Sequence, residues 1–357
     1  MDTPQTTRIP ATAGAGPLIV DALGSLANPN LDDGGDPVHA VDARALDDAI
    51  ASGLAAIHQT VGYVSGDGDP YHSTHADLDA WDHLLERNGD RLHRVLVSDD
   101  IRQARRSGRI GVIYGFQNGT MLAPDPGRAA EFARRGVRIV QLTYNGANPL
   151  GDGAMAPENR GLTDVGHAVV EALNHAGLAV DLSHSGERTC LDAVNASREP
   201  VIISHTGCRA LADLPRNKTD AELRAVADRG GLVGIYFMPF LAIGRQPTAL
   251  DLIAHLEHAI DVCGDEHVCI GTDGAAPGID DLGRYRETLA REVAERRASG
   301  ISATGECADV VPFLPDLEGP GRFRRLAGLL EARGHRGDRI ERILGGNFLR
   351  YARGIWG

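Results

Sequence analysis

Residues 178–208 read LAVDLSHSGERTCLDAVNASREPVIISHTGC, and their strand–helix–strand pattern indicates the fold. Two apolar runs of strand length flank a helical segment, and each run ends on a Ser-His pair that contains His184 or His205. This order predicts two neighbouring parallel strands, which lie roughly 5 Å apart, so both imidazoles are expected at one edge. That edge is the expected active face. Two histidines hydrogen-bonded in a loop layer are the structural alternative.

The same alternation of strands and amphipathic helices extends over most of the chain. The predicted strands lie at 17–25, 54–62, 109–118, 137–145, 178–185, 200–206, 231–239 and 266–274. Eight such units match a (β/α)8 TIM barrel, followed here by a C-terminal helical extension. A doubly wound open sheet is the alternative, but its glycine fingerprint after the first strand is absent. A further apolar stretch at 93–97 is interpreted as a connector, because the residues after it cap the next helix.

Composition and charge narrow the class of protein. The chain has 357 residues, 42% of them hydrophobic, and a net charge of −13, which argues against a nucleic-acid groove or an anionic membrane surface. No segment approaches the roughly 20 apolar residues that span a bilayer. The five cysteines form no CxxC pair, so they are expected to be reduced thiols. We therefore expect a cytoplasmic protein whose partner is a small molecule.

The domain organisation follows from the same survey. Residues 1–16 are rich in Pro, Thr, Ala and Gly and are predicted to be a flexible arm. Residues 17–357 are predicted to form a single barrel domain, with a Gly-Gly-Asn turn docking the last helix against the barrel. A homodimer is compatible with this organisation, by analogy with other barrels.

Side chains at the carboxyl ends of the predicted strands supply the candidate site. They are Leu23, Ser25, His58, Gln117, Tyr144, Asn145, His184, His205 and Asp273, with Phe237 and Met238 as an apolar wall. Asp273, in CIGTDG, suits a general base or a metal ligand, and capping the next helix is its alternative role. Arg216, next to Asn217 in LPRNKTD, has a planar fork suited to a substrate carboxylate; a surface ion pair is the alternative.

Five stretches of the chain together resemble a known family. They are NRGLTDVGHAVVEALNHAGLAVDLSHSGERT, PVIISHTGCRALADLPRNKTD, GGLVGIYFMPFL, CIGTDG and ILGGNFLR. They are similar to the membrane (renal) dipeptidase family, peptidase family M19 of the amidohydrolase superfamily, from about residue 18 to the end of the chain. The resemblance implies a TIM barrel that holds two zinc ions at the strand ends and hydrolyses dipeptides.

The resemblance also implies roles for individual residues. His184 and His205 match the two later histidines of the second metal site. Asp273 matches the last Asp, which serves the first metal and proton transfer, and Arg216 matches the arginine that holds the substrate carboxylate.

The chain departs from the family pattern at four decisive positions. Leu23 and Ser25 stand where the first strand reads His-x-Asp, Gln117 replaces the bridging Glu, and Tyr144 replaces a histidine of the fourth strand. Leu cannot ligate a metal, and neutral Ser and Gln oxygens lack the charge to hold two cations. The first metal site is therefore expected to be lost, which leaves at most one zinc ion, bound by His184, His205 and Asp273, or none.

Three functions remain open at this point. The first is a dipeptidase-like hydrolase of a small carboxylated amide or dipeptide, using at most one metal ion. The second is a metal-free or single-metal lyase, isomerase or cyclase acting on an amino-acid-derived molecule. The third is a catalytically silent small-molecule-binding protein. The candidate catalytic residues are Asp273, Tyr144 and Gln117, and the candidate substrate-binding residues are Arg216, Asn217, Asn145 and Met238.

Overall fold

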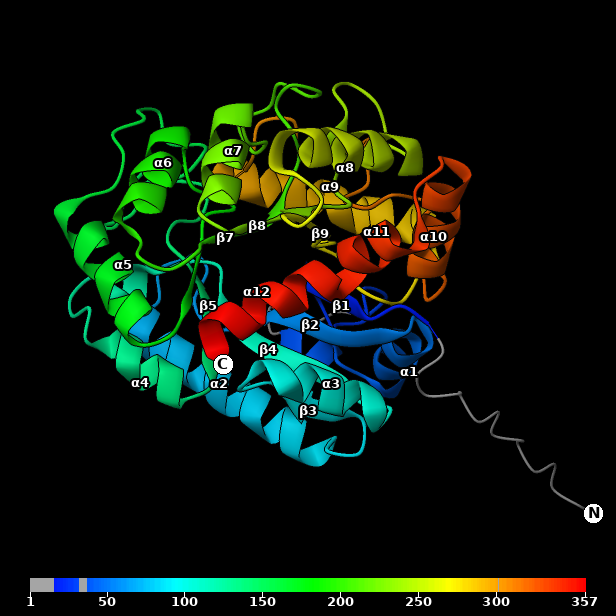
Figure 1. Cartoon of the computed structure of the whole chain (residues 1–357), viewed down its shortest axis with the longest axis horizontal. Helices are drawn as coiled ribbons and strands as arrows, with labels where there is room; N and C mark the ends of the chain where they lie inside the picture. The colour runs from blue at the N-terminus through cyan, green and yellow to red at the C-terminus, as the bar shows by residue number, and fades with distance from the viewer. Residues whose placement is uncertain (1–15, 32–36, 301) are drawn as a thin grey trace, which may run out of the picture.

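Parallel strands alternate with helices around a closed barrel in the computed structural model, which describes residues 16–31, 37–300 and 302–357 (Figure 1). The strands are β1 (Ile19–Gly24), β2 (Leu54–Thr60), β3 (Leu92–Arg94), β4 (Ile110–Phe116), β5 (Val137–Gln141), β6 (Ala179–Asp181), β7 (Ile202–Thr206), β8 (Leu232–Ile235) and β9 (Val268–Ile270). Within the described residues they are ordered β1-β2-β4-β5-β6-β7-β8-β9, with β3 beside β4. The predicted (β/α)8 TIM barrel is confirmed.

The barrel closes between its first and last strands. The Asp273 amide donates to the carbonyl of Leu23 at 2.8 Å, and the Ser25 amide donates to the carbonyl of Gly274 at 3.0 Å. These bonds lie just beyond the end of β9, so the loop carrying Asp273 is tied directly to the end of β1. The carboxyl ends of all the barrel strands therefore meet at one mouth, where barrel enzymes carry their chemistry.

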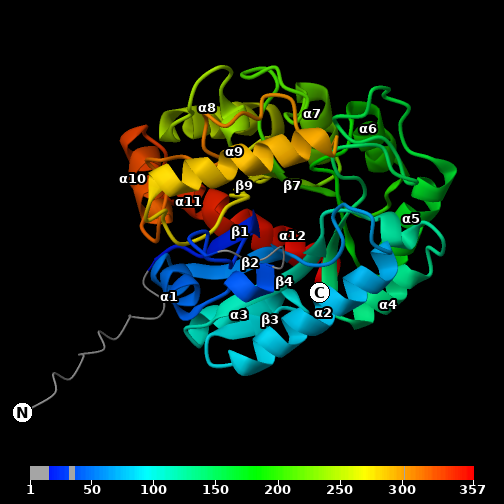
Figure 2. The same cartoon turned by 180° about the vertical axis from the view of Figure 1, so that it is seen from behind.

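The helices form the outer ring and the two covers of the barrel. They are α1 (Ala43–Ala51), α2 (Pro70–Arg87), α3 (Ser98–Arg106), α4 (Arg128–Arg134), α5 (Asp164–His175), α6 (Glu187–Ala196), α7 (Asp220–Asp228), α8 (Ala249–Cys263), α9 (Leu282–Ala298), α10 (Arg322–Ala332), α11 (Gly337–Glu341) and α12 (Asn347–Trp356). Helix α12 crosses one end of the barrel in Figure 1, and α9 crosses the other side in Figure 2.

The C-terminal helix α12 covers the amino end of the barrel. Phe348 and Trp356 of α12 are buried against residues near the strand starts, such as Val20 and Leu232. The Gly-Gly-Asn turn makes this docking possible: a Cβ at Gly345 would lie 2.5 Å from the Leu18 carbonyl oxygen, and the Asn347 amide donates to the carbonyls of Asp265 and Val268. The predicted docking of the C-terminus against the barrel is thus observed.

The stretch interpreted as a connector contains a short strand. Residues Leu92–Arg94 form β3, which pairs in parallel with β4 outside the barrel path. The Asp100 carboxylate caps α3 as expected, accepting from the amides of Leu96 and Val97. The interpretation of 93–97 failed because edge pairing with β4 needs only three residues, too few for a pattern in the sequence.

The structure tests two further predictions only in part, namely the N-terminal arm and the absence of a membrane span. The arm predicted at 1–16 lies outside the described residues except for Gly16. Among the helices that the structure describes, none is long and apolar enough to cross a membrane.

Candidate active site at the barrel mouth

His184 and His205 lie side by side at the ends of β6 and β7. Their Nε2 atoms are 2.9 Å apart, and both side chains are buried. Burial, followed by the positive charge of Arg216, holds the pKa of both imidazoles well below the usual range. Both rings are therefore neutral at physiological pH, with lone pairs available as ligands or bases.

The hydrogen bonds around the two rings assign their tautomers. Arg216 can only donate, so its contact of 3.1 Å makes Nε2 of His184 an acceptor and leaves Nδ1–H to donate to Asn145 Oδ1 at 2.7 Å. The Ser204 hydroxyl donates to Asp181, so it accepts from Nδ1–H of His205 at 2.9 Å. Both Nε2 atoms are therefore acceptors that lie side by side, and Arg216 donates to the one on His184. This arrangement favours a cation or a proton between them, as in histidines held for a metal by Nδ1–H donors.

The buried carboxylate of Asp181 hydrogen-bonds the residues that precede the two histidines. Asp181, the last residue of β6, accepts from the amide and hydroxyl of Ser183 and from the amide and hydroxyl of Ser204. Four donors satisfy both carboxylate oxygens, which is what a charged group needs at a fully buried position. The network joins β6 to β7 and fixes the backbone from which both histidines project.

Arg216 reaches the histidines from the loop after β7. Its side chain is 2% exposed and donates to the Ser183 carbonyl at 2.7 Å and to Nε2 of His184 at 3.1 Å. The alternative, an ion pair on the surface, is therefore excluded. The positive charge also acts on Asp273, whose pKa it lowers against the effect of burial. Arg216 thus contacts one histidine directly and acts on Asp273 through its charge.

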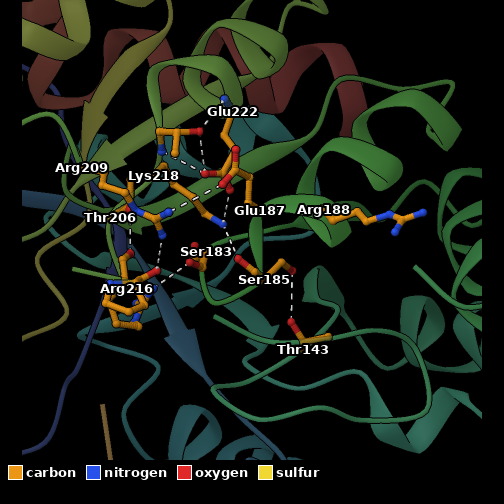
Figure 3. Close-up of polar contacts among 12 residues, drawn as sticks. Thr143, Ser183, Ser185, Glu187, Arg188, Thr206, Arg209, Arg216, Lys218 and Glu222 are labelled. Carbon is orange, nitrogen blue, oxygen red and sulfur yellow. Dashed lines mark hydrogen bonds and ion pairs between the residues drawn. The ribbon is translucent and has the colours of Figure 1, made fainter. Parts of the chain in front are cut away.

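A buried ion pair braces the same loop. The side chains of Lys218 and Glu222 are 2% and 1% exposed, and Nζ of Lys218 lies 3.0 Å from Oε1 of Glu222. The Lys218 ammonium also donates to the Ser185 carbonyl (Figure 3). The second Glu222 oxygen accepts from Thr219 in a capping box at the start of α7. The sequence TDAE after Lys218 signals the capping box, but nothing local indicates that Lys218 is buried.

Asp273 occupies a strained position between two cavities. It is the one residue other than glycine with a positive φ, 54°, among those the structure describes. Asp tolerates this left-handed conformation better than most side chains. Burial raises its pKa to about 6. It lines a cleft of about 820 Å³ together with Leu23, Ser25 and Gln117, and a smaller cavity of about 240 Å³ with Met238.

The remaining predicted residues include Tyr144, Gln117 and Asn217. Tyr144 stacks on His184 with ring centroids 4.4 Å apart, and burial and the Asp273 charge raise its pKa, so it stays a donor. Gln117 faces the cleft and donates to Thr60 Oγ1 at 2.8 Å. Asn217 differs from expectation: it is buried, and its amide donates to two backbone carbonyls and accepts from the Tyr236 hydroxyl. Its contact with substrate stays a prediction.

The residues of the mouth do not fit a centre of two metal ions. Leu23 is buried and apolar, and Ser25 and Gln117 are neutral. Within the described part of the chain, no three His, Cys, Asp or Glu side chains are close enough to share an ion. The structure brings His184 and His205 together but does not join Asp273 to them as a third ligand. The two histidines fit two ligand positions of one ion.

His58 was placed at the mouth by its position in the sequence, but it lies inside the barrel. Its Nδ1 bonds the Ala22 carbonyl at 2.7 Å, while Nε2 is buried without a hydrogen-bond partner among the described residues. The ring fits only because a neighbour lacks a side chain: a Cβ at Gly115 would lie 2.0 Å from Nε2. Burial lowers the pKa of this histidine, so it is a neutral core residue beneath the site.

Asp21 was missed by the sequence reasoning. It is 3% exposed and accepts from the amide and hydroxyl of Thr272, the residue before Asp273, at 2.7 and 2.6 Å. A carboxylate in the middle of the apolar run IVDALG was the available signal. It ties β1 to the loop that carries Asp273, and burial raises its pKa to about 7.

This shift predicts a specific dependence of stability on pH. Since the folded-state pKa is raised from 3.8 to about 7, folding takes up a proton and stability falls as pH rises through this window. We expect Asp21→Asn to raise the melting temperature at pH 8 and to have less effect at pH 5. Between pH 5 and pH 8 this effect changes by about 2 to 3 kcal/mol in the free energy of unfolding, because the unfolded-state carboxyl is already largely ionised at pH 5. Thermal unfolding at the two pH values measures it.

The control for this experiment is Asp21→Ala, which removes the acceptor for Thr272 and is expected to destabilise the protein at both pH values. If the asparagine variant had the same pH dependence as the parent, Asp21 would not be the titrating group.

Comparisons with known proteins agree with this architecture. The family model for membrane dipeptidase, Peptidase family M19, matches residues 21–304, so this chain belongs to that family. It is 32% identical over 237 residues to the dipeptidase verJ of Clonostachys rogersoniana, a match covering 64% of this chain and 61% of the relative. It is 30% identical over 227 residues to the dipeptidase tcpJ of Claviceps purpurea, covering 61% and 53%. The matches thus span less than two thirds of these relatives.

Solved structures share the fold over nearly the whole chain. An amidohydrolase from Pseudomonas aeruginosa superposes with a TM-score of 0.81 at 28% identity, covering 96% of this chain and 97% of that one. A metallo peptidase from Rhodobacter sphaeroides, liganded with a phosphinate mimic of the dipeptide L-Ala-D-Ala, superposes with a TM-score of 0.74 at 18% identity, covering 96% and 100%. The second likeness shows the fold alone.

Proposed function

We propose that this protein is a dipeptidase-like hydrolase of a small amide or dipeptide with a free carboxylate, working with at most one metal ion. The observation that carries the proposal is the pair of neutral imidazoles, whose Nε2 atoms face each other 2.9 Å apart beside Arg216. Membership of the dipeptidase family supports the reaction class. Leu23, Ser25 and Gln117 supply no charged metal ligand, which supports the limit of one metal ion.

The side chains of the mouth take distinct roles in this proposal. His184 and His205 would hold the ion, which when bound would supply a water ionised near neutral pH. Asp273 accepts or returns a proton at its carboxylate. Tyr144 and Gln117 donate hydrogen bonds to the amide oxygen as negative charge develops on it. Met238 and Asn145 complete the wall against which the substrate lies.

The reaction class is tested by measuring release of free amino acids from L-Ala-L-Ala and L-Ala-D-Ala. The purified protein is assayed after dialysis against a chelator and again with one equivalent of zinc. Release of amino acids supports the proposal. A protein that binds these dipeptides in a calorimeter but releases no product would contradict it and favour a silent binding role.

Arg216 provides a second test, which concerns the substrate carboxylate. We expect Arg216→Ala to raise KM for a free dipeptide by roughly 10-fold to 1,000-fold, the loss of one charge-assisted bidentate pair. The effect on the dipeptide amide, which lacks the carboxylate, should be smaller. Arg216→Lys is the matched control, because it keeps the charge but loses the fork. Equal losses on both substrates would show that Arg216 acts only through His184, to which it donates.

A further inference from the structure

A small apolar cavity opens beside Asp273, next to the cleft that contains Gln117. Its volume is about 240 Å³, and both Asp273 and Ser25 line it. Its apolar wall includes Met238, Ile279, Tyr285, Phe313, Leu314 and Leu317. Sites for whole drug-sized ligands measure roughly 300 to 1,000 Å³, so this cavity is of a size for one side chain rather than for a complete substrate.

Charged groups at the edge of the cavity are already engaged. The Arg322 guanidinium donates to the carbonyls of Ala275, Ala276 and Gly319. Glu318 brings an opposite charge to the same edge. The remaining surface is mostly aromatic and aliphatic, and such a surface gains free energy by covering an apolar group and none by covering a charged one.

Much of the wall lies outside the part of the chain that matches the family model. That match ends at residue 304, whereas Phe313, Leu314 and Leu317 follow it. Tyr285 of α9 packs edge-on against Phe313 with ring centroids 5.6 Å apart, which joins the later segment to the helix that crosses the mouth (Figure 2). The cavity is therefore shaped in part by residues that follow the stretch matched by the family model.

We propose that this cavity binds an apolar side chain of the substrate, of the size of leucine or phenylalanine, on the residue whose amide bond lies at Asp273. The inference rests on the proposed function, since it places the scissile amide at the mouth. The cavity and the larger cleft adjoin each other, because Asp273 and Ser25 line both. The cleft then accepts the rest of the molecule.

The experiment compares kcat/KM for L-Ala-L-Ala with those for L-Leu-L-Ala and L-Ala-L-Leu. Burying the additional carbons of leucine should favour one of the two leucine dipeptides by roughly 10-fold to 200-fold. Ile279 is half-buried in the wall, and Ile279→Trp fills the cavity, so the ratio of leucine to alanine substrate should fall to near 1. Leu250→Trp, on an exposed position of α8, is the matched control and should retain the preference.

A second variant keeps the proposal testable if Ile279→Trp does not fold. Phe313→Ala enlarges the cavity and should shift the preference from leucine toward phenylalanine. Equal kcat/KM for the alanine and leucine dipeptides in the parent protein would overturn the inference, as would an unchanged ratio in a folded Ile279→Trp. If no dipeptide is hydrolysed, the proposed function fails, and calorimetry with the same dipeptides decides the cavity separately. Tighter binding of leucine that Ile279→Trp removes supports it, and equal binding overturns it.

Discussion

Replacing His184 or His205 by alanine is expected to lower kcat/KM for a dipeptide by roughly 100-fold to 10,000-fold. This is the contribution of one positioned acid, base or ligand. Each imidazole presents a neutral Nε2 lone pair to the same point, 2.9 Å from the other. Alanine removes one of the two and leaves a metal ion with a single ligand, so bound zinc should also be lost. Steady-state kinetics and metal analysis of the purified variants measure both effects.

The fold is expected to survive these changes, because both residues lie at the mouth rather than in the packed layers of the barrel. His255→Ala is the matched control: this histidine is equally buried, but it accepts from the Cys208 amide and bonds the Leu241 carbonyl, away from the site. Its loss should lower the melting temperature and leave the metal content unchanged. If His184→Ala or His205→Ala unfolds instead, the pair is structural and the assigned site is wrong.

Restoring the missing ligands should create a centre of two metal ions. We expect Gln117→Glu alone to tighten binding of one ion at His184 and His205, since it adds a negative charge close to the cation. The triple change Leu23→His, Ser25→Asp and Gln117→Glu should admit a second ion, because it supplies the imidazole and the two carboxylates that the first site lacks. Isothermal titration with zinc measures the stoichiometry.

The double variant Leu23→His, Ser25→Asp is the control for this experiment. It has the ligands of the first strand but keeps the neutral Gln117, so two cations would lie together without a shared carboxylate, and we expect it to bind fewer than two. Circular dichroism should accompany the titration, because Leu23 is buried and a histidine there is less apolar. A parent protein that already binds two zinc ions would show that these ligand positions are wrongly assigned. A folded triple variant that binds fewer than two would show the same.

The barrel and the set of residues at its mouth can be predicted from local patterns in the sequence. Strand and helix periods are local properties, and parallel strands joined by helices bring their carboxyl ends to one edge. His184, His205 and Asp273 could therefore be assigned to the mouth from their positions at the ends of apolar runs. The departures at Leu23, Ser25 and Gln117 emerge only by comparison with the pattern of the family that the chain resembles.

The contacts between these residues depend on how distant parts of the chain pack together. Asp21 bonds Thr272 across 251 residues of sequence, Arg216 turns inward to His184, and Lys218 is buried against Glu222. The wall of the apolar cavity likewise combines the loop after β8, α9 and the segment that follows α9. Burial, charge partners and cavity shape depend on side chains from elements far apart in the chain, and no local period carries that information.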